Sequence, residues 1–222
     1  MTVRVLTIKE NILGANEEKA KINRRLLDKH GILMVNIMAS PGAGKTSLIL
    51  KTISSLRGKA RIAVIEGDIA SSIDAEKVSR LGITAIQINT GGGCHLDAYM
   101  IAKALDNLPL DEIDLLFVEN VGNLVCPAGF DLGEHKKLLL LSVPEGDDKP
   151  YKYPVLFAEA DLVLISKSDV LPYFDFNLDA FSEAARGLRP DIKVFVISAK
   201  TGEGMGAWFS WLKDEMKQRK KS

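Results

Sequence analysis

The sequence is short of cysteine, of long apolar runs and of net charge, and each shortage excludes a class of protein. Only two cysteines, Cys94 and Cys126, occur in 222 residues, which is too few for a disulfide scaffold. No apolar run approaches the roughly 20 residues that a membrane-spanning helix needs. Lys+Arg and Asp+Glu are both 29, so the charge balance favours neither a nucleic acid nor an anionic membrane surface as partner.

The amino terminus also lacks the layout of a signal peptide, because charged residues interrupt its short apolar stretch. We therefore expect a cytoplasmic protein with reduced thiols and with no nucleic-acid or membrane partner. The length and the 46% hydrophobic content suit one domain of ordinary size with a sizeable core.

The most informative segment joins an apolar run, residues 32–38, to a loop of small residues that ends in Gly-Lys-Thr at 44–46. A helical pattern follows, and this strand–loop–helix context is what a phosphate-binding loop requires. Gly42 and Gly44 allow backbone N–H groups to point at one anion, and the helix dipole strengthens that field. Ala39 stands where such loops usually have glycine, so we expect it to end the strand.

The residues of this loop are assigned to the nucleotide phosphates and to Mg²⁺. Lys45 is expected to reach the β- and γ-phosphates, and the Thr46 hydroxyl is expected to ligate Mg²⁺. A strand-to-helix turn that only resembles the motif is the alternative. The residues predicted to contact phosphate are Gly42, Ala43, Gly44, Lys45, Thr46 and Ser47.

Carboxylates that follow two other predicted strands belong to the same expected site. Glu119 ends an apolar strand and can hold Mg²⁺ directly or through water, while Gly122 can donate its N–H to a γ-phosphate. The alternative is a solvated carboxylate at a strand end. Asp68 and Asp74 are expected in a mobile loop that senses Mg²⁺ and the γ-phosphate, although each also suits a helix cap or a turn. The predicted catalytic residues are Lys45, Thr46, Asp68 and Glu119, and the predicted magnesium ligands are Thr46, Asp68, Asp74 and Glu119.

The loop after a further apolar strand predicts guanine as the base. Residues 166–169, Ser-Lys-Ser-Asp, stand where guanine-nucleotide-binding proteins have Asn-Lys-x-Asp. The Asp169 carboxylate can accept hydrogen bonds from N1–H and from the exocyclic amine of guanine, a donor pair that adenine lacks. The stem of Lys167 can cover the face of the purine. Ser166 replaces the usual Asn, which weakens the match.

A second base-contacting loop follows the last predicted strand, at Ser198, Ala199 and Lys200. In this loop the N–H of Ala199 would meet guanine O6. The two loops together favour GTP over ATP. The competing interpretation is an ATP-dependent kinase or a partitioning ATPase that uses the same phosphate-binding loop, with the cysteines as structural residues.

Outside these motifs, apolar runs alternate with helical patterns, which predicts an α/β fold with a mainly parallel sheet and helices on both faces. An N-terminal helix over 8–29 should end near Gly31. We assign residues 1–31 to a helical extension packed on a nucleotide-binding domain of residues 32–222. The further strands are predicted at 62–65, 83–88, 113–118, 137–143, 162–165 and 194–197, and the further helices at 96–105, 178–188 and 205–217.

Cys94, His95 and Cys126 offer two thiols and an imidazole, a ligand set that suits Zn²⁺ or Ni²⁺. We place Cys94 and His95 at a helix start, where the dipole would lower the pKa of a thiol and favour the ligating thiolate. One chain supplies three ligands, so a fourth would come from water or from a second subunit. Two buried thiols without a metal are the alternative, because no Cys-x-x-Cys spacing is present.

Three segments set around the phosphate-binding loop, Thr90–Asp97, Glu119–Pro127 and Glu145–Pro150, resemble the HypB family. These are GTPases that assist nickel delivery during the maturation of [NiFe]-hydrogenase. The resemblance covers nearly the whole chain. It implies a P-loop fold of the SIMIBI GTPase type, hydrolysis of GTP to GDP, and a nickel or zinc site formed by the two cysteines and the histidine near a dimer interface. It also implies a GTP-dependent homodimer, a HypA-like nickel metallochaperone as partner, and the hydrogenase large-subunit precursor as an indirect client.

The sequence departs from some of these relatives. No cysteine precedes Cys94 and no His-rich tract occurs, so we expect no N-terminal nickel-storage motif. A urease-associated nickel GTPase is a further alternative, but that family carries a compact Cys-Pro-His instead of two separate segments. Another alternative is a nickel carrier whose nucleotide site is regulatory and not catalytic.

Overall fold

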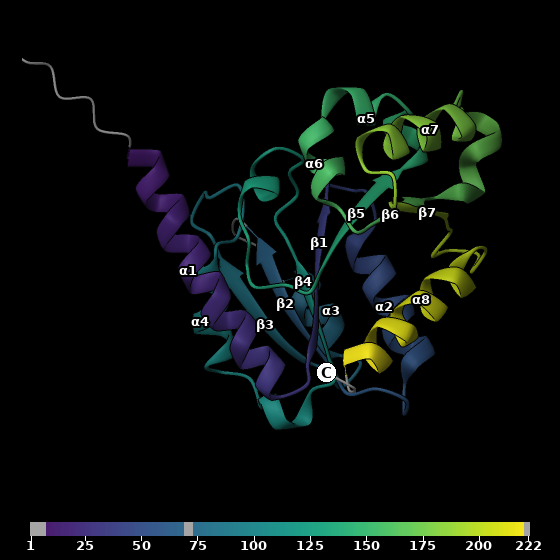
Figure 1. Ribbon diagram of the computed structural model, residues 1–222. Helices are drawn as coiled ribbons and strands as arrows, with labels where there is room; N and C mark the ends of the chain where they lie inside the picture. Colours follow the sequence, from purple (N-terminus) through teal and green to yellow (C-terminus); the bar gives the residue numbers. More distant parts are fainter. Residues whose placement is uncertain (1–7, 69–72, 220–222) are drawn as a thin grey trace, which may run out of the picture.

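The computed structural model describes residues 8–68 and 73–219. Its centre is a sheet of seven parallel strands in the order β3-β2-β4-β1-β5-β6-β7 (Figure 1). The strands are β1 (Leu33–Ala39), β2 (Ile62–Asp68), β3 (Thr84–Asn89), β4 (Leu115–Glu119), β5 (Lys136–Ser142), β6 (Leu162–Ser166) and β7 (Lys193–Val196). Because all the strands run the same way, the loops that follow them meet at one edge of the sheet, where ligands bind in open α/β folds.

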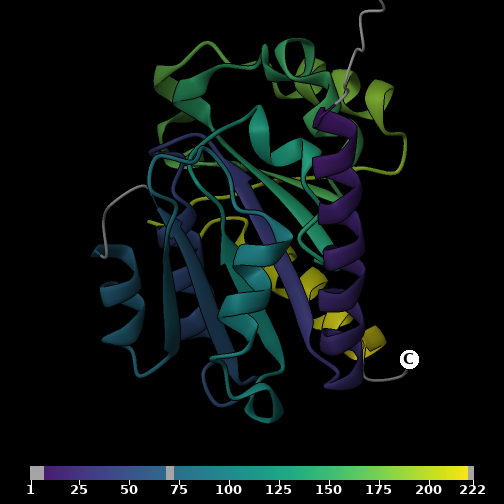
Figure 2. The same cartoon turned by 90° about the vertical axis from the view of Figure 1, so that its left-hand side faces the viewer.

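Helices cover both faces of the sheet (Figures 1 and 2). They are α1 (Ile8–Lys29), α2 (Lys45–Leu56), α3 (Ile73–Ser79), α4 (Ala98–Leu105), α5 (Lys149–Lys152), α6 (Pro154–Glu159), α7 (Leu178–Leu188) and α8 (Met205–Arg219). Short 3₁₀ turns lie at η1 (Leu110–Glu112), η2 (Cys126–Gly129), η3 (Val143–Glu145) and η4 (Ser168–Tyr173). None of the helices in the described ranges has the length and apolar character that a membrane crossing requires.

Strand β1 shows why its sequence is apolar throughout. Val35 belongs to the core that includes Trp208 of α8, whereas its neighbour Met34 belongs to a second core with Leu27 of α1 and Ile101 of α4. Successive side chains of a strand point to opposite faces of the sheet, and here both faces are covered by helices. Every residue of β1 is therefore buried.

The predicted α/β fold with a parallel sheet and helices on both faces is confirmed. β1 ends at Ala39 as expected, and α1 stops at Lys29, before Gly31 with its φ of 65°. The other predicted strands and helices agree with the structure to within a few residues at each end. The sequence analysis did not predict α3, α5 or α6, because helices of four to seven residues are too short to show a helical period.

Helix α1 is held against the rest of the chain by buried polar contacts as well as by apolar packing. The Asn16 side chain accepts from Ala98 N (2.9 Å) and donates to Asp131 O (2.8 Å). The Asn23 side chain donates to Ala98 O (2.8 Å) and to Leu132 O (3.0 Å). These bonds tie α1 to the start of α4 and to the loop that precedes β5. The division of the chain at residue 31 remains a prediction.

Candidate functional site

The loop between β1 and α2 has the curled backbone that its small residues predict. Gly42 and Gly44 have φ angles of 76° and 105°, in the left-handed region where a side chain would be strained. Such a backbone turns N–H groups toward one point, and the N-terminus of α2 adds its dipole there. Lys45 is the first residue of α2 and is only 9% exposed.

A cavity of about 520 Å³ lies at this loop and gathers residues from four segments of the chain. The predicted phosphate and magnesium residues that line it are Gly42, Gly44, Lys45, Thr46, Ser47, Asp68, Asp74, Glu119 and Gly122. Gly122 lies directly against the loop, since a Cβ on it would stand 2.9 Å from Pro41 Cγ and 3.0 Å from Pro41 N. The segment after β4 and the phosphate-binding loop are therefore in contact.

Glu119 is a buried carboxylate and not a solvated one. It is 6% exposed, its Oε1 accepts from Thr46 Oγ1 (3.1 Å), and its Oε2 has no hydrogen-bond partner within the described chain. Burial raises the pKa of Glu119 above its ordinary value, opposed by the nearby charge of Lys45. A buried carboxylate oxygen without a partner beside a threonine hydroxyl fits a hard divalent cation, so Thr46 and Glu119 are suited to hold Mg²⁺.

Glu66 is a second buried carboxyl group in this region, and the sequence analysis did not single it out. It pairs in register with Glu119 on the neighbouring parallel strand, so both side chains lie on the same face of the sheet. Burial and the negative charge of Glu119 raise the pKa of Glu66 to about 10. Glu66 is therefore protonated at neutral pH and adds no second negative charge beneath the cavity.

Asp68 and Asp74 both line the cavity at the phosphate-binding loop, which we call the phosphate cavity. Asp74 does not belong to a loop. It lies in the first turn of α3, where its carboxylate pairs with Lys77 Nζ (2.7 Å). Lys77 also lines the cavity, and the sequence analysis missed it together with the short helix that carries it. Residues 69–72, the centre of the expected sensing loop, lie outside the described residues.

A second cavity of about 250 Å³ lies beside the first, since Gly44 and Ser47 line both. Its lining includes all of the residues predicted to contact the base, which are Lys167, Asp169, Ser198, Ala199 and Lys200, and also Ala43. Asp169 Oδ1 accepts from Ser198 Oγ (2.6 Å), and this bond holds the pKa of Asp169 below its ordinary value. The carboxylate is therefore ionised, as an acceptor for two guanine donors must be.

The loop predicted to contact the base is bonded to the loop predicted to bind phosphate by two side chains. Ser166 Oγ donates to Ala43 O (2.6 Å), and Lys167 Nζ donates to Gly42 O (2.7 Å). Ser166, which stands in place of the usual Asn, thus makes a buried bond between the two loops. Lys167 has a φ of 59°, the one positive φ of a non-glycine residue in the described ranges.

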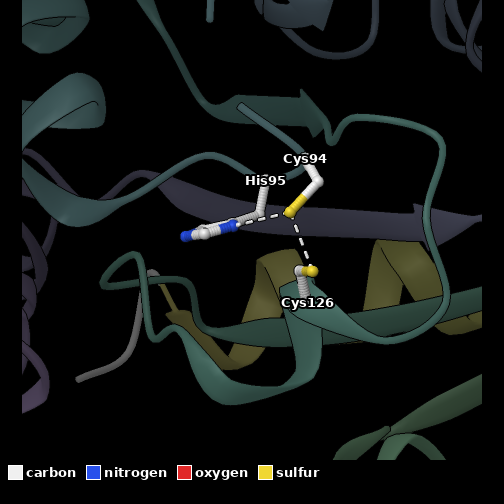
Figure 3. Close-up of side chains that lie close together, drawn as sticks. All are labelled: Cys94, His95 and Cys126. Atoms are coloured by element: carbon white, nitrogen blue, oxygen red, sulfur yellow. Dashed lines mark hydrogen bonds between the residues drawn. The ribbon is translucent and has the colours of Figure 1, made fainter. Parts of the chain in front are cut away.

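The side chains of Cys94, His95 and Cys126 lie close together (Figure 3). They belong to the segments that follow β3 and β4, so they lie at the same edge of the sheet as the cavities. Cys94 Sγ is 2.8 Å from Cys126 Sγ and 3.5 Å from His95 Nδ1, and one ligand atom from each residue lies within 4.8 Å of the others. The imidazole stacks on Phe130 with a centroid distance of 3.9 Å. Two thiols and one imidazole suit Ni²⁺ or Zn²⁺ and leave coordination positions for further ligands.

The protonation states of this cluster differ from the expectation based on a helix start. α4 begins only at Ala98, with Asp97 as its N-cap, so Cys94 and His95 lie before the helix. The hydrogen bond between Cys126 and Cys94 raises the pKa of the Cys126 thiol, and burial lowers the pKa of His95. At neutral pH the Cys126 thiol therefore carries a proton and the imidazole carries none, so a metal must displace the thiol proton.

Two asparagines in the segment that joins the sites were missed by the sequence analysis. Asn123 accepts from Val125 N (2.7 Å) and Cys126 N (3.3 Å), and its Nδ2 lies 3.5 Å from Cys126 Sγ. Asn120 is 1% exposed and bonds to Leu96 N, next to His95. Asparagine directly after a strand is typical of turns that bond their own backbone, and this signal was available in the sequence.

Comparisons with known proteins agree with this arrangement. The family model "CobW/HypB/UreG, nucleotide-binding domain" matches residues 33–196. The hydrogenase maturation factor HypB of Azotobacter vinelandii is 50% identical over 209 residues, which are 94% of this chain and 69% of that protein. A probable hydrogenase maturation factor HypB of Methanocaldococcus jannaschii is 43% identical over 218 residues, 98% of this chain and 99% of that one.

A solved structure extends the likeness to three dimensions. The crystal structure of HypB from Helicobacter pylori in complex with nickel superposes on this chain with a TM-score of 0.87 at 38% identity. The match covers 92% of this chain and 96% of the other. Both the order of the elements and the extent of the fold are therefore shared.

Proposed function

Because this chain belongs to the HypB family of hydrogenase maturation factors, we propose that it binds GTP and hydrolyses it to GDP and phosphate to drive or regulate nickel insertion into [NiFe]-hydrogenase. One observation carries this proposal. The segment Glu119–Cys126 begins at a buried carboxylate in the phosphate cavity and ends at a thiol of the metal cluster, by which we mean the three side chains of Cys94, His95 and Cys126. Nickel is the cargo in this scheme, and the cluster holds it in passing.

Hydrolysis in such a site depends on positioning and on neutralising charge. Lys45 and the backbone N–H groups of the loop hold the phosphates, Gly122 offers its N–H to the γ-phosphate, and the Asp169 carboxylate selects guanine. When bound at Thr46 and Glu119, Mg²⁺ would neutralise charge on the phosphate oxygens. No arginine is among the described residues that line the phosphate cavity, so we expect slow intrinsic turnover.

The cluster of Cys94, His95 and Cys126 supports a homodimer, because three ligands leave coordination positions open. A second copy of the chain is expected to complete the coordination in a homodimer that forms with GTP. A HypA-like metallochaperone is the expected nickel-exchanging partner, and the hydrogenase large-subunit precursor is the indirect client. We place the protein in the cytoplasm. Zn²⁺ fits the same ligands, and X-ray absorption at the nickel and zinc edges distinguishes the two metals.

Single-turnover phosphate release tests the proposed enzyme. Lys45→Ala should slow the release of phosphate from GTP by about 100-fold or more, because a preorganised charge on the transferred group is lost. Lys217→Ala, which removes an exposed lysine at the end of α8, is the matched control and should leave the rate unchanged. Equal rates in wild type and Lys45→Ala would favour a carrier whose nucleotide site is only regulatory.

Competition for the site by GTP and ATP tests the base assignment. GTP should displace a fluorescent guanine nucleotide far better than ATP does, because Asp169 finds no donor pair on adenine. Similar displacement by the two nucleotides would favour the kinase or partitioning-ATPase alternative.

A further inference from the structure

Leu96, the residue that follows His95, is held by the ends of two strands of the nucleotide site. Its N–H donates to Asn120 Oδ1 (3.1 Å), and Asn120 directly follows Glu119. Its side chain lies against Gly67 at the end of β2, so closely that a Cβ on Gly67 would stand 2.7 Å from Leu96 Cδ1. Leu96 is 0% exposed. Because close-packed interiors transmit displacements, a movement of either strand end should also move Leu96.

The Asn120 carboxamide is fixed in one orientation by its other partners. Its Oδ1 also accepts from Val121 N (2.9 Å), and its Nδ2 donates to Asn36 Oδ1 (3.2 Å) in the middle of β1. Asn36 Nδ2 in turn donates to Glu134 Oε1 (3.1 Å), whose other oxygen accepts from Leu132 N (2.7 Å). This buried network has a partner at every step, and such networks define one geometry more strictly than apolar packing does.

We propose that Asn120 is the positioning residue that couples the nucleotide site to the metal cluster. The segment Glu119–Gly122 contacts the phosphate-binding loop and is placed to respond to the γ-phosphate. The carboxamide carries that displacement to the backbone of Leu96, and so to the adjacent His95. This inference rests on the proposed function, because it requires a site that binds both a guanine nucleotide and nickel.

Nickel affinity measured in two nucleotide states tests the role of Asn120. Titrations are made with GDP and with a non-hydrolysable GTP analogue, both with Mg²⁺, and the ratio of the two nickel dissociation constants is the readout. Wild type should give a ratio of about 10-fold, within the range usual for coupled sites. Asn120→Ala should bring the ratio to within about twofold of unity, while nickel and nucleotide still bind.

Two further variants separate coupling from stability. Asn23→Ala removes an equally buried asparagine that also bonds to two backbone groups but lies on α1; it should lower stability and keep the wild-type ratio. Asn120→Asp keeps the acceptor for Leu96 N–H but loses the donor to Asn36 Oδ1, so its ratio should lie between those of wild type and Asn120→Ala. Hydrogen exchange adds a direct readout, since the Leu96 amide should exchange faster in Asn120→Ala and not in Asn23→Ala.

The outcomes are distinguishable. A ratio of unity in wild type would overturn both the coupled function and this inference. A wild-type ratio that persists in Asn120→Ala would overturn the inference alone. If Asn120→Ala does not fold, Asn36→Ala decides the question, because it frees the carboxamide to rotate. The ratio should then fall by at least about threefold, and an unchanged ratio would overturn the inference.

Discussion

The nucleotide site and the metal cluster lie at the same edge of the sheet but are built in different ways. The nucleotide site is assembled from short segments that each follow a strand, and Ser166 and Lys167 bond two of these segments together. The cluster consists of three partly buried side chains from two separate segments, and its two cysteines are 32 positions apart in sequence. The first site is bonded together within the fold, whereas the second brings only three possible metal ligands together from two separate segments.

The largest expected effect tests whether the nucleotide site is specific by itself. Asp169→Asn leaves the two guanine donors with one acceptor, so GTP affinity should fall by about 100-fold and most of the preference over ATP should disappear. Nucleotide competition measures both changes. Asp179→Asn, at an exposed position of α7, is the control. An unchanged preference for GTP would mean that the base-contacting loops were assigned wrongly.

The next effect tests whether nickel binding at the cluster can be lost while the nucleotide site still binds GTP. Loss of an outer-shell partner already weakens metal sites by about 10–100-fold, so Cys126→Ala should weaken nickel binding by about 100-fold or more. Nickel titration by calorimetry measures this loss. GTP affinity should stay close to that of wild type, because the thiol lies outside both cavities. Wild-type nickel affinity in this variant would remove Cys126 from the ligand set.

The pH dependence of nickel binding sharpens the contrast, since the cluster must lose a thiol proton before that sulfur can bind the metal. The pKa of Cys126 is raised, so nickel displaces a thiol proton, whereas the pKa of His95 is lowered and its imidazole is already neutral. Nickel affinity should therefore rise with pH, by about 10-fold per unit for each proton released, between about pH 6 and 8. Titrations in several buffers measure the slope, and a flat profile would contradict thiolate ligation.

The smallest expected effect tests the bond between the two nucleotide loops. Ser166→Ala removes one buried hydrogen bond to Ala43 O, worth about 1 kcal/mol, so GDP should dissociate about fivefold faster. Stopped-flow release of a fluorescent GDP measures the rate. Ser54→Ala, which removes a bond to Leu50 O on the exposed face of α2, is the matched control. Equal effects of both substitutions would show that the hydrogen bond between Ser166 and Ala43 has no special role in retaining GDP.

Much of the fold could be predicted because long apolar strands and strong turn residues act locally. The strand that ends at Ala39, the curled turn at Gly42 and Gly44, and the stop of α1 before Gly31 all depend on neighbours in sequence. Helix α3 could not be predicted, because its seven residues form less than two full helical periods. Lys77, which this helix places in the phosphate cavity, was missed for the same reason.

Site residues that directly follow a strand could be predicted from the sequence. Features of the site that depend on contacts between distant segments were harder to predict. Glu119 could be named from the end of an apolar run, but its pairing with Glu66 depends on the register of two strands that are far apart in sequence. The meeting of Cys94 and Cys126 has no signal in their spacing, and only the family resemblance pointed to it. The role of Asn120 depends on two tertiary hydrogen-bond partners, Leu96 and Asn36, that no local pattern shows.

The contacts of α1 bear on how this chain can be shortened. A fragment that starts after residue 31 would lack Asn16 and Asn23, and it would leave Ala98, Asp131 and Leu132 with backbone groups that must find water instead. Ala98 is the first residue of α4, and Asp131 and Leu132 lie shortly before β5. The first helix is thus part of the folded unit, and a trimmed version of the protein should unfold more easily even though every motif residue was still present.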